Sequence, residues 1–104
     1  MLPYPPKALT AKASQSTSIT VYWSHGFDGY SATLRYILDI SRKTPVAWRQ
    51  YTDSITASRL NFTVSGLEPY TVYMLRMKSV NAIGQSSYSS LVEARTLEDG
   101  MYVI

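Results

Sequence analysis

Apolar and polar residues alternate with a period of two along most of this chain. In the stretch SITVYW, Ile19, Val21 and Trp23 alternate with more polar neighbours. Because successive side chains of a β-strand point to opposite faces, this alternation predicts a strand with one face buried. The same pattern predicts strands at residues 34–40 (LRYILDI), 60–64 (LNFTV) and 73–77 (YMLRM), with Leu34 and Leu60 on the inward faces.

Two further segments alternate less regularly and are predicted to be edge strands, LTAKA at residues 9–13 and SLVEARTL at residues 90–97. Clusters of turn-forming residues separate the strands: KASQSTS, SHGFDGYSA, SRKTP, TDSITAS, SGLEP and NAIGQSS. No window has the 3.6-residue period of an amphipathic helix. About seven short strands, spaced by about 8 to 15 residues, are typical of an antiparallel sandwich.

The stretch GLEPYTVY lies where the chain must cross from one sheet to the other. Gly66 permits a tight turn, Leu67 can fill the end of the core, and Pro69 stiffens the crossing. Tyr73, at the start of the next strand, can bury its ring and return its hydroxyl to the backbone upstream. This arrangement is the tyrosine corner of immunoglobulin-like sandwiches; the alternative is a tyrosine that only fills the core.

Over residues 5–97 the chain resembles a fibronectin type III domain. The resemblance is carried by Pro6 with Leu9 and Ala11, SITVYW with its inward Trp23, LRYILDI, FTVSGLEPYTVYMLRMKSVNAIG, and a last strand ending at Thr96. It implies an all-β fold, an immunoglobulin-like seven-stranded antiparallel β-sandwich. Residues 1–4 are then a linker, and residues 98–104 a linker or the start of the next segment. The expected core contains Trp23, Tyr36, Leu38, Phe62, Leu67, Tyr73 and Leu75.

The loop GFDGYSA resembles a loop of neural cell adhesion receptors of the immunoglobulin superfamily, of the sidekick and Down syndrome cell adhesion molecule type. Tyr30 and Ala32 stand where those receptors usually have asparagine and proline. The resemblance implies a module from the extracellular part of a cell-surface adhesion or receptor protein, next to other immunoglobulin-like or fibronectin type III domains. The alternative is a fibronectin type III module of an intracellular muscle or cytoskeletal scaffold protein.

Composition agrees with one folded domain and narrows its partners. Of 104 residues, 45% are hydrophobic and 16% charged, so a packed core is expected. There is no cysteine, which excludes disulfides and thiolate metal sites. A net charge of +3 is too weakly basic to indicate nucleic acid. No apolar run reaches the about 20 residues that span a bilayer, so direct membrane insertion is not expected.

The residues offer little for catalysis. His25 is the only histidine, so a histidine metal cluster is excluded, and it lies in a predicted loop. The serines lack a Gly-x-Ser-x-Gly elbow, and Asp28, Asp39 and Asp53 lack the spacing of a calcium loop. No glycine-rich phosphate loop is present. The chain is predicted not to be an enzyme and to have no catalytic residue, no cofactor and no metal.

A binding surface is predicted on the outer face of the sheet that contains residues 34–40 and 73–78. Alternation places five residues outward there: Arg35, Ile37, Met74, Arg76 and Lys78. Such a basic patch with apolar flanks suits a protein ligand, a homophilic partner or a sulfated glycan. The alternative is a spacer domain whose charges are simply solvated.

Two shorter motifs add hypotheses. GQSSYSS resembles the Trp-Ser box of cytokine receptor domains, with tyrosine for tryptophan and the second Trp-Ser missing, and Tyr88 is predicted to stack on Arg76 or to pack at the domain edge. NFT satisfies the rule for N-glycosylation at Asn61. Because Phe62 and Val64 face the core, Asn61 and Thr63 are predicted to face solvent.

Overall fold

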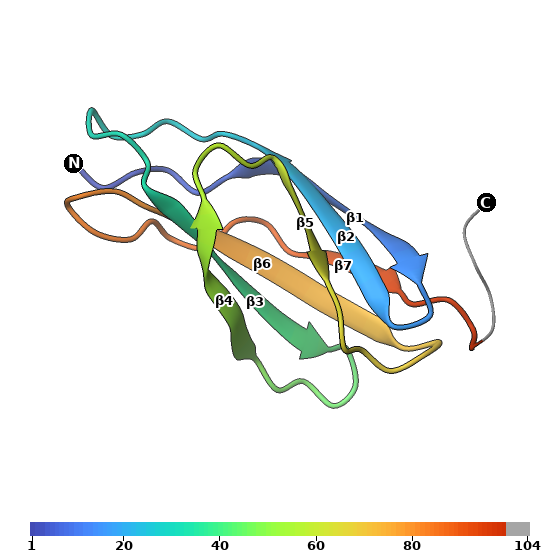
Figure 1. Ribbon diagram of the computed structural model, residues 1–104. Helices are drawn as coiled ribbons and strands as arrows, with labels where there is room; N and C mark the ends of the chain where they lie inside the picture. Colours follow the sequence, from blue (N-terminus) through green and yellow to red (C-terminus); the bar gives the residue numbers. More distant parts are fainter. Residues whose placement is uncertain (100–104) are drawn as a thin grey trace.

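The computed structural model describes residues 1–99, which form seven strands and, within that part of the chain, no helix (Figure 1). The strands are β1 (Lys7–Gln15), β2 (Ser18–Ser24), β3 (Arg35–Arg42), β4 (Arg49–Thr56), β5 (Asn61–Val64), β6 (Val72–Val80) and β7 (Val92–Arg95). They form two antiparallel sheets, with the strand orders β1-β2-β5 and β4-β3-β6-β7. The predicted all-β, seven-stranded sandwich is confirmed.

The core lies between the sheets and comes from the inward residues of each strand. Ile19 and Val21 of β2 and Leu75 of β6 are fully buried. The rings of Trp23 and Tyr36 meet edge to face, with centroids 5.5 Å apart. All seven residues expected inside lie in this core, Phe62 half-buried at its margin. Such burial removes the largest apolar surfaces from water and is the main stabilising contribution to the fold.

The corner between β5 and β6 is held by side chains as well as by a turn. Gly66 has φ +73°, and a Cβ there would meet nothing within 4 Å, so glycine serves the backbone conformation and not a close approach. Leu67 is buried, and the Tyr73 hydroxyl accepts a hydrogen bond from the Glu68 amide at 2.9 Å. The Thr96 hydroxyl donates to the Glu68 carbonyl at 2.7 Å. The residue that follows β7 therefore closes the corner.

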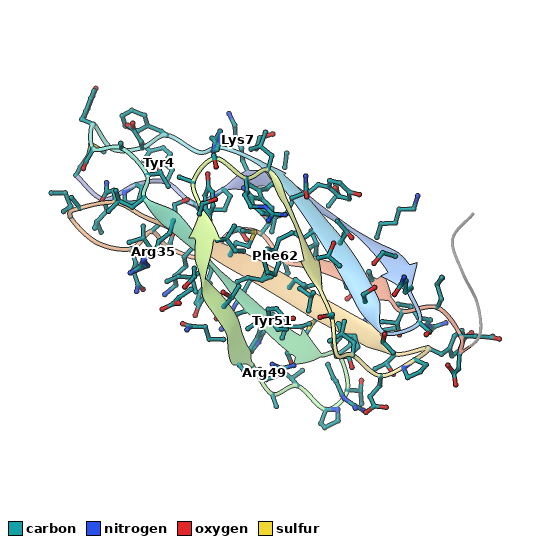
Figure 2. The ribbon with its side chains drawn as sticks, in the orientation of Figure 1. Tyr4, Lys7, Arg35, Arg49, Tyr51 and Phe62 are labelled. Carbon is teal, nitrogen blue, oxygen red and sulfur yellow. The ribbon has the colours of Figure 1, made fainter. Side chains whose placement is uncertain are left out.

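The side of the sandwich between β4 and β5 is joined by an aromatic pair. The rings of Tyr51 on β4 and Phe62 on β5 meet edge to face, with centroids 6.1 Å apart (both are labelled in Figure 2). The Tyr51 hydroxyl donates to the Ser65 carbonyl at 3.4 Å and accepts from the Ser65 amide at 3.2 Å. The Ser65 hydroxyl, 3.4 Å from that of Tyr51, and the Ser65 amide lower the pKa of Tyr51, because hydrogen bonds donated to the phenolic oxygen favour its charged form.

Three sequence predictions were wrong in this region of the fold. TDSITAS, predicted as a turn, belongs mostly to β4, an edge strand with irregular register against β3 in which Ile55 is the one buried residue. Because such a strand has few inward apolar residues, its sequence shows no clear alternation. Leu34 and Leu60, predicted inward, are exposed and precede β3 and β5. Their backbones still pair, Leu34 with Val80 and Leu60 with Trp23, but their side chains lie beyond the packed part of the sandwich.

Candidate interaction surfaces

The predicted binding residues lie together on the outer face of the four-stranded sheet. Arg35 and Ile37 of β3 pair in register with Val80 and Lys78 of β6, and Ser41 pairs with Met74. They do not form an open patch, however. Ile37 is buried, and the Arg76 side chain is only 22% exposed. Two segments that flank the sheet cover this part of the face, which the alternation of single strands does not reveal.

A stack of alternating rings and cations forms that cover. The Arg76 guanidinium carbon lies 4.0 Å from the centroid of the Trp48 ring and 3.7 Å from that of Tyr88. The Lys78 ammonium lies 4.2 Å from the centroid of the same Tyr88 ring. A desolvated cation–π contact contributes about 2 kcal/mol or more. The predicted contact of Tyr88 with Arg76 is confirmed, whereas Trp48, which directly precedes the unpredicted strand β4, was missed.

A buried carboxylate anchors the stack from below. Asp39 is 7% exposed, and its Oδ2 accepts a hydrogen bond from the Tyr88 hydroxyl at 2.9 Å. The same oxygen lies 3.5 Å from Arg76 Nε. A buried charge without a partner would be strongly destabilising, and here one ion pair and one hydrogen bond compensate it. Asp39 therefore orients both partners of the central cation–π contact.

Serine hydroxyls hold Tyr88 in place over the sheet. The Ser86 and Ser89 hydroxyls each accept a hydrogen bond from a β6 amide, of Ser79 and of Met77 respectively, both at 2.9 Å. The amides of the two serines donate back to the carbonyls of the same β6 residues, both at 2.8 Å. The second Trp-Ser of the cytokine-receptor box was predicted to be missing from this stretch. Two serines three positions apart nevertheless pair with β6, and the spacing of GQSSYSS was the signal for it.

Beside the stack lies a hollow of about 310 Å³. Arg76, Lys78 and Arg49 line it, together with Trp48, Tyr88, Gln50, Gln85 and the buried residues Ile37 and Asp39. Its charged groups are three cations and one carboxylate, so it attracts anions. Arg35 lies further along β3 and does not line it.

A second surface is formed by aromatic residues of the N-terminal segment and of the loop between β2 and β3, two segments that lie at the same end of the molecule (Figure 1). Phe27 meets Tyr4 and Tyr30 edge to face, with centroid distances of 5.5 and 5.0 Å. All three rings are exposed, Tyr30 by 87%. Exposed aromatic clusters are uncommon on isolated soluble domains and typically mark contact sites.

The N-terminal residues pack against the neighbouring loops and support this cluster. The Tyr4 amide donates to the Phe27 carbonyl at 2.8 Å. Asn81 donates from Nδ2 to the Met1 and Asp28 carbonyls, both at 2.9 Å. A Cβ on Gly29 would lie 2.5 Å from the Met1 carbonyl oxygen, so only glycine admits this approach. The segment predicted as a linker is therefore docked along its length.

Asn61, the predicted glycosylation residue, is exposed at the start of β5, and Thr63 of the same triplet is exposed as well. The Thr63 hydroxyl shares a 2.9 Å hydrogen bond with that of Thr20 on β2. Both residues therefore lie on the outer face of the three-stranded sheet, which is opposite to the face with the cation–aromatic stack.

His25 is exposed, and its Nδ1 is hydrogen-bonded to the hydroxyl of Tyr36, whose pKa is raised by burial. Among residues 1–99 no group of three or more histidine, cysteine or acidic residues is placed to hold a metal. The same part of the chain has no helix long and apolar enough to cross a membrane.

A family model described as fibronectin type III domain matches residues 4–95. The chain belongs to the fibronectin type III domain family. Protein sidekick-1 of Gallus gallus is 39% identical over 101 residues, and the cell adhesion molecule DSCAM of Homo sapiens is 30% identical over 89 residues. These matches cover 93% and 86% of this chain, and they confirm the predicted resemblance to the sidekick and Down syndrome cell adhesion molecule receptors.

This fibronectin type III chain spans 5% of the length of the chicken sidekick-1 protein and 4% of human DSCAM. Among solved structures, domains A168–A170 from titin have a TM-score of 0.83 at 24% identity, with 93% of this chain and 33% of the titin chain covered. Chicken CNTN1 FN1–FN3 has a TM-score of 0.82 at 22% identity, covering 91% and 33% of the two chains. At such identities the structural matches show the fold alone.

Proposed function

We propose that this chain is a non-enzymatic module from the extracellular part of a multidomain cell-surface adhesion or receptor protein. Its role is that of a spacer that also binds other proteins. The observation that carries the proposal is the 39% identity to sidekick-1 across nearly the whole chain. A 35% identity over 97 residues to receptor-type tyrosine-protein phosphatase F of Danio rerio, whose name states a receptor, supports the same class.

The second candidate is a module of an intracellular muscle or cytoskeletal scaffold protein. The structural match to titin domains favours it, but at 24% identity that match reflects the common sandwich. The sequence relatives at 30–39% identity are closer, and several of them are named as sidekick or adhesion proteins. The cell-surface assignment is therefore preferred.

Two surfaces suit the proposed contacts. The exposed aromatic cluster of Tyr4, Phe27 and Tyr30 surrounds the N-terminal segment, where a neighbouring immunoglobulin-like or fibronectin type III domain would sit. The outer face of the four-stranded sheet, with its cationic hollow, suits a protein ligand, a homophilic partner or a sulfated glycan.

The compartment can be tested with an antibody raised against this domain. Cells that express the full-length parent protein are stained intact and, in parallel, after permeabilisation. We expect intact cells to be labelled, and brief external protease treatment to remove the label. Labelling only after permeabilisation would exclude the cell-surface function and select the scaffold candidate. An antibody to a cytosolic protein, which must label only permeabilised cells, is the control.

A further inference from the structure

Arg76 is held in a fixed orientation with part of its guanidinium unused. Trp48 and Tyr88 cover its two faces, at 4.0 and 3.7 Å, and Asp39 lies 3.5 Å from its Nε. Within residues 1–99 the buried Arg76 Nε has no hydrogen-bond partner, so its contact with Asp39 is an ion pair, and no side-chain hydrogen bond engages the two terminal nitrogens of the guanidinium. The donors of a guanidinium form a planar fork that matches a carboxylate or a sulfate in bidentate geometry. A fork that is already oriented loses little further entropy when such a group binds.

The surroundings of this fork favour an anion. Lys78 and Arg49 line the same hollow as Arg76, and Asp39 is its only acidic residue. The Asp39 carboxylate is already engaged by Tyr88 and Arg76, so it does not neutralise the other two cations. Gln50 and Gln85 add amide groups at the rim. An anionic group that enters the hollow would thus meet the oriented guanidinium of Arg76 and two further positive charges.

The shape of the hollow distinguishes between anionic partners. A sulfated glycan carries many charges and needs a row of exposed cations. Here Arg76 is mostly covered, Arg35 lies outside the hollow, and the Asp39 carboxylate lies beside Arg76, its partner on β6. One carboxylate on an aliphatic stem fits better, because the stem can pack against the Trp48 and Tyr88 rings.

We propose that this hollow binds the side-chain carboxylate of a glutamate in an acidic segment of a protein partner, with Arg76 as the bidentate donor. The proposal rests on the protein-binding role proposed above and gives that role a site and a ligand chemistry. Lys78 and Arg49 attract the acidic segment and orient it. Charges at the rim of an interface act mainly by raising the association rate.

The test is an NMR titration of the ¹⁵N-labelled 104-residue chain with an acetylated, amidated Gly-Glu-Gly peptide. The matched control is Gly-Gln-Gly, which has the same shape without the charge. We expect the glutamate peptide to shift the Arg76 Nε–H and Trp48 indole signals, with a dissociation constant of the order of millimolar. The glutamine peptide should leave these signals in place.

Variants assign the effect to the fork. Arg76→Lys keeps the charge but loses the planar fork, and we expect about tenfold weaker binding. Arg49→Gln should weaken binding by about threefold without touching the stack, so it serves as the second variant if Arg76→Lys does not fold. Arg59→Gln is the control, since Arg59 also lies over a ring, that of Phe62 at 5.7 Å, but lies outside the hollow.

Three outcomes would overturn the proposal. One is equal binding of the glutamate and glutamine peptides, or of neither. Another is a loss with Arg59→Gln as large as that with Arg49→Gln, which would indicate nonspecific charge attraction. The third is saturable binding of a heparin tetrasaccharide at β6 while the glutamate peptide causes no shift, which would assign the hollow to a glycan. None of these results bears on surface labelling of cells, so the proposed function is tested separately.

Discussion

Single side chains close the ends of this sandwich where backbone pairing stops. At the corner before β6, the Tyr73 hydroxyl satisfies the Glu68 amide and the Thr96 hydroxyl satisfies the Glu68 carbonyl. Thr96 Oγ1 also accepts from the Thr71 amide at 2.9 Å. Partly buried backbone groups that lack a strand partner need such side chains, because an unpaired polar group away from water is costly.

Replacement of Tyr73 by phenylalanine should therefore lower stability while leaving the core ring in place. The Glu68 amide loses its acceptor, so we expect the free energy of unfolding to fall by about 0.5–1.5 kcal/mol, measured by urea denaturation. Tyr22→Phe is the control, since the Tyr22 side chain is exposed and its change should stay within about 0.5 kcal/mol. Equal stability of wild type and Tyr73→Phe would show that the corner hydrogen bond contributes nothing.

At the scale of the element, the segment of residues 85–91 takes the place of a longer last strand. β7 itself has only four residues, Val92–Arg95, and pairs with the first part of β6. Upstream of it, Ser86 and Ser89 satisfy the β6 amides of Ser79 and Met77 with their hydroxyls. The backbone thus bends away from β6 between the two serines, while their hydroxyls keep the amides of Ser79 and Met77 hydrogen-bonded. This bend places Tyr88 over Arg76.

Ser86→Ala and Ser89→Ala should each uncover one buried amide of β6. We expect each to cost about 1–3 kcal/mol, because a buried donor is left unsatisfied. The specific readout is hydrogen exchange: the amide of Ser79 should exchange faster in Ser86→Ala, and that of Met77 in Ser89→Ala. Ser87→Ala is the matched control, since the Ser87 side chain forms no hydrogen bond within residues 1–99. Unchanged protection of both amides would contradict the assigned role.

At the scale of the whole molecule, the two outer faces differ in character. The four-stranded sheet carries the cation–aromatic stack and its hollow, whereas the three-stranded sheet carries Asn61 and Thr63. β5 is an edge strand of that sheet, and a carbohydrate on Asn61 would cover the edge and keep other chains from pairing with it. Protein contacts would then be directed to the opposite face and to the N-terminal end.

Secretion of the chain from mammalian cells should therefore yield a glycosylated product. We expect a mass above that of the bare polypeptide, which an N-glycosidase removes. Asn61→Gln should abolish the added mass, and Thr63→Ser, which keeps the acceptor triplet, should preserve it. A bare mass for the fully secreted wild-type chain would count against the glycan and against the support that it lends to an extracellular location.

The period-two pattern alone was enough to predict β2, β3, β5, β6 and the core-facing side of each, because burial of one sheet face dictates alternation within a single strand. The outer side of β3 is buried as well, at Ile37 and Asp39, which the pattern did not predict. The corner at Tyr73 was predictable for a similar reason, since its turn residues are local in sequence. β4 was not, because an edge strand with one buried residue has too few inward positions to show a period.

Only the tertiary structure decided the contacts between residues that are distant in sequence. The ring of Trp48, which precedes β4, contacts Arg76 of β6, and Asn81 donates a hydrogen bond to the Met1 carbonyl. The alternation correctly placed Arg76 outward, yet it could not show that two rings cover it. The sequence pattern of a strand shows on which face of that strand a side chain lies. Which residues cover the side chain depends on other segments, and these reach it only when the two sheets pack together.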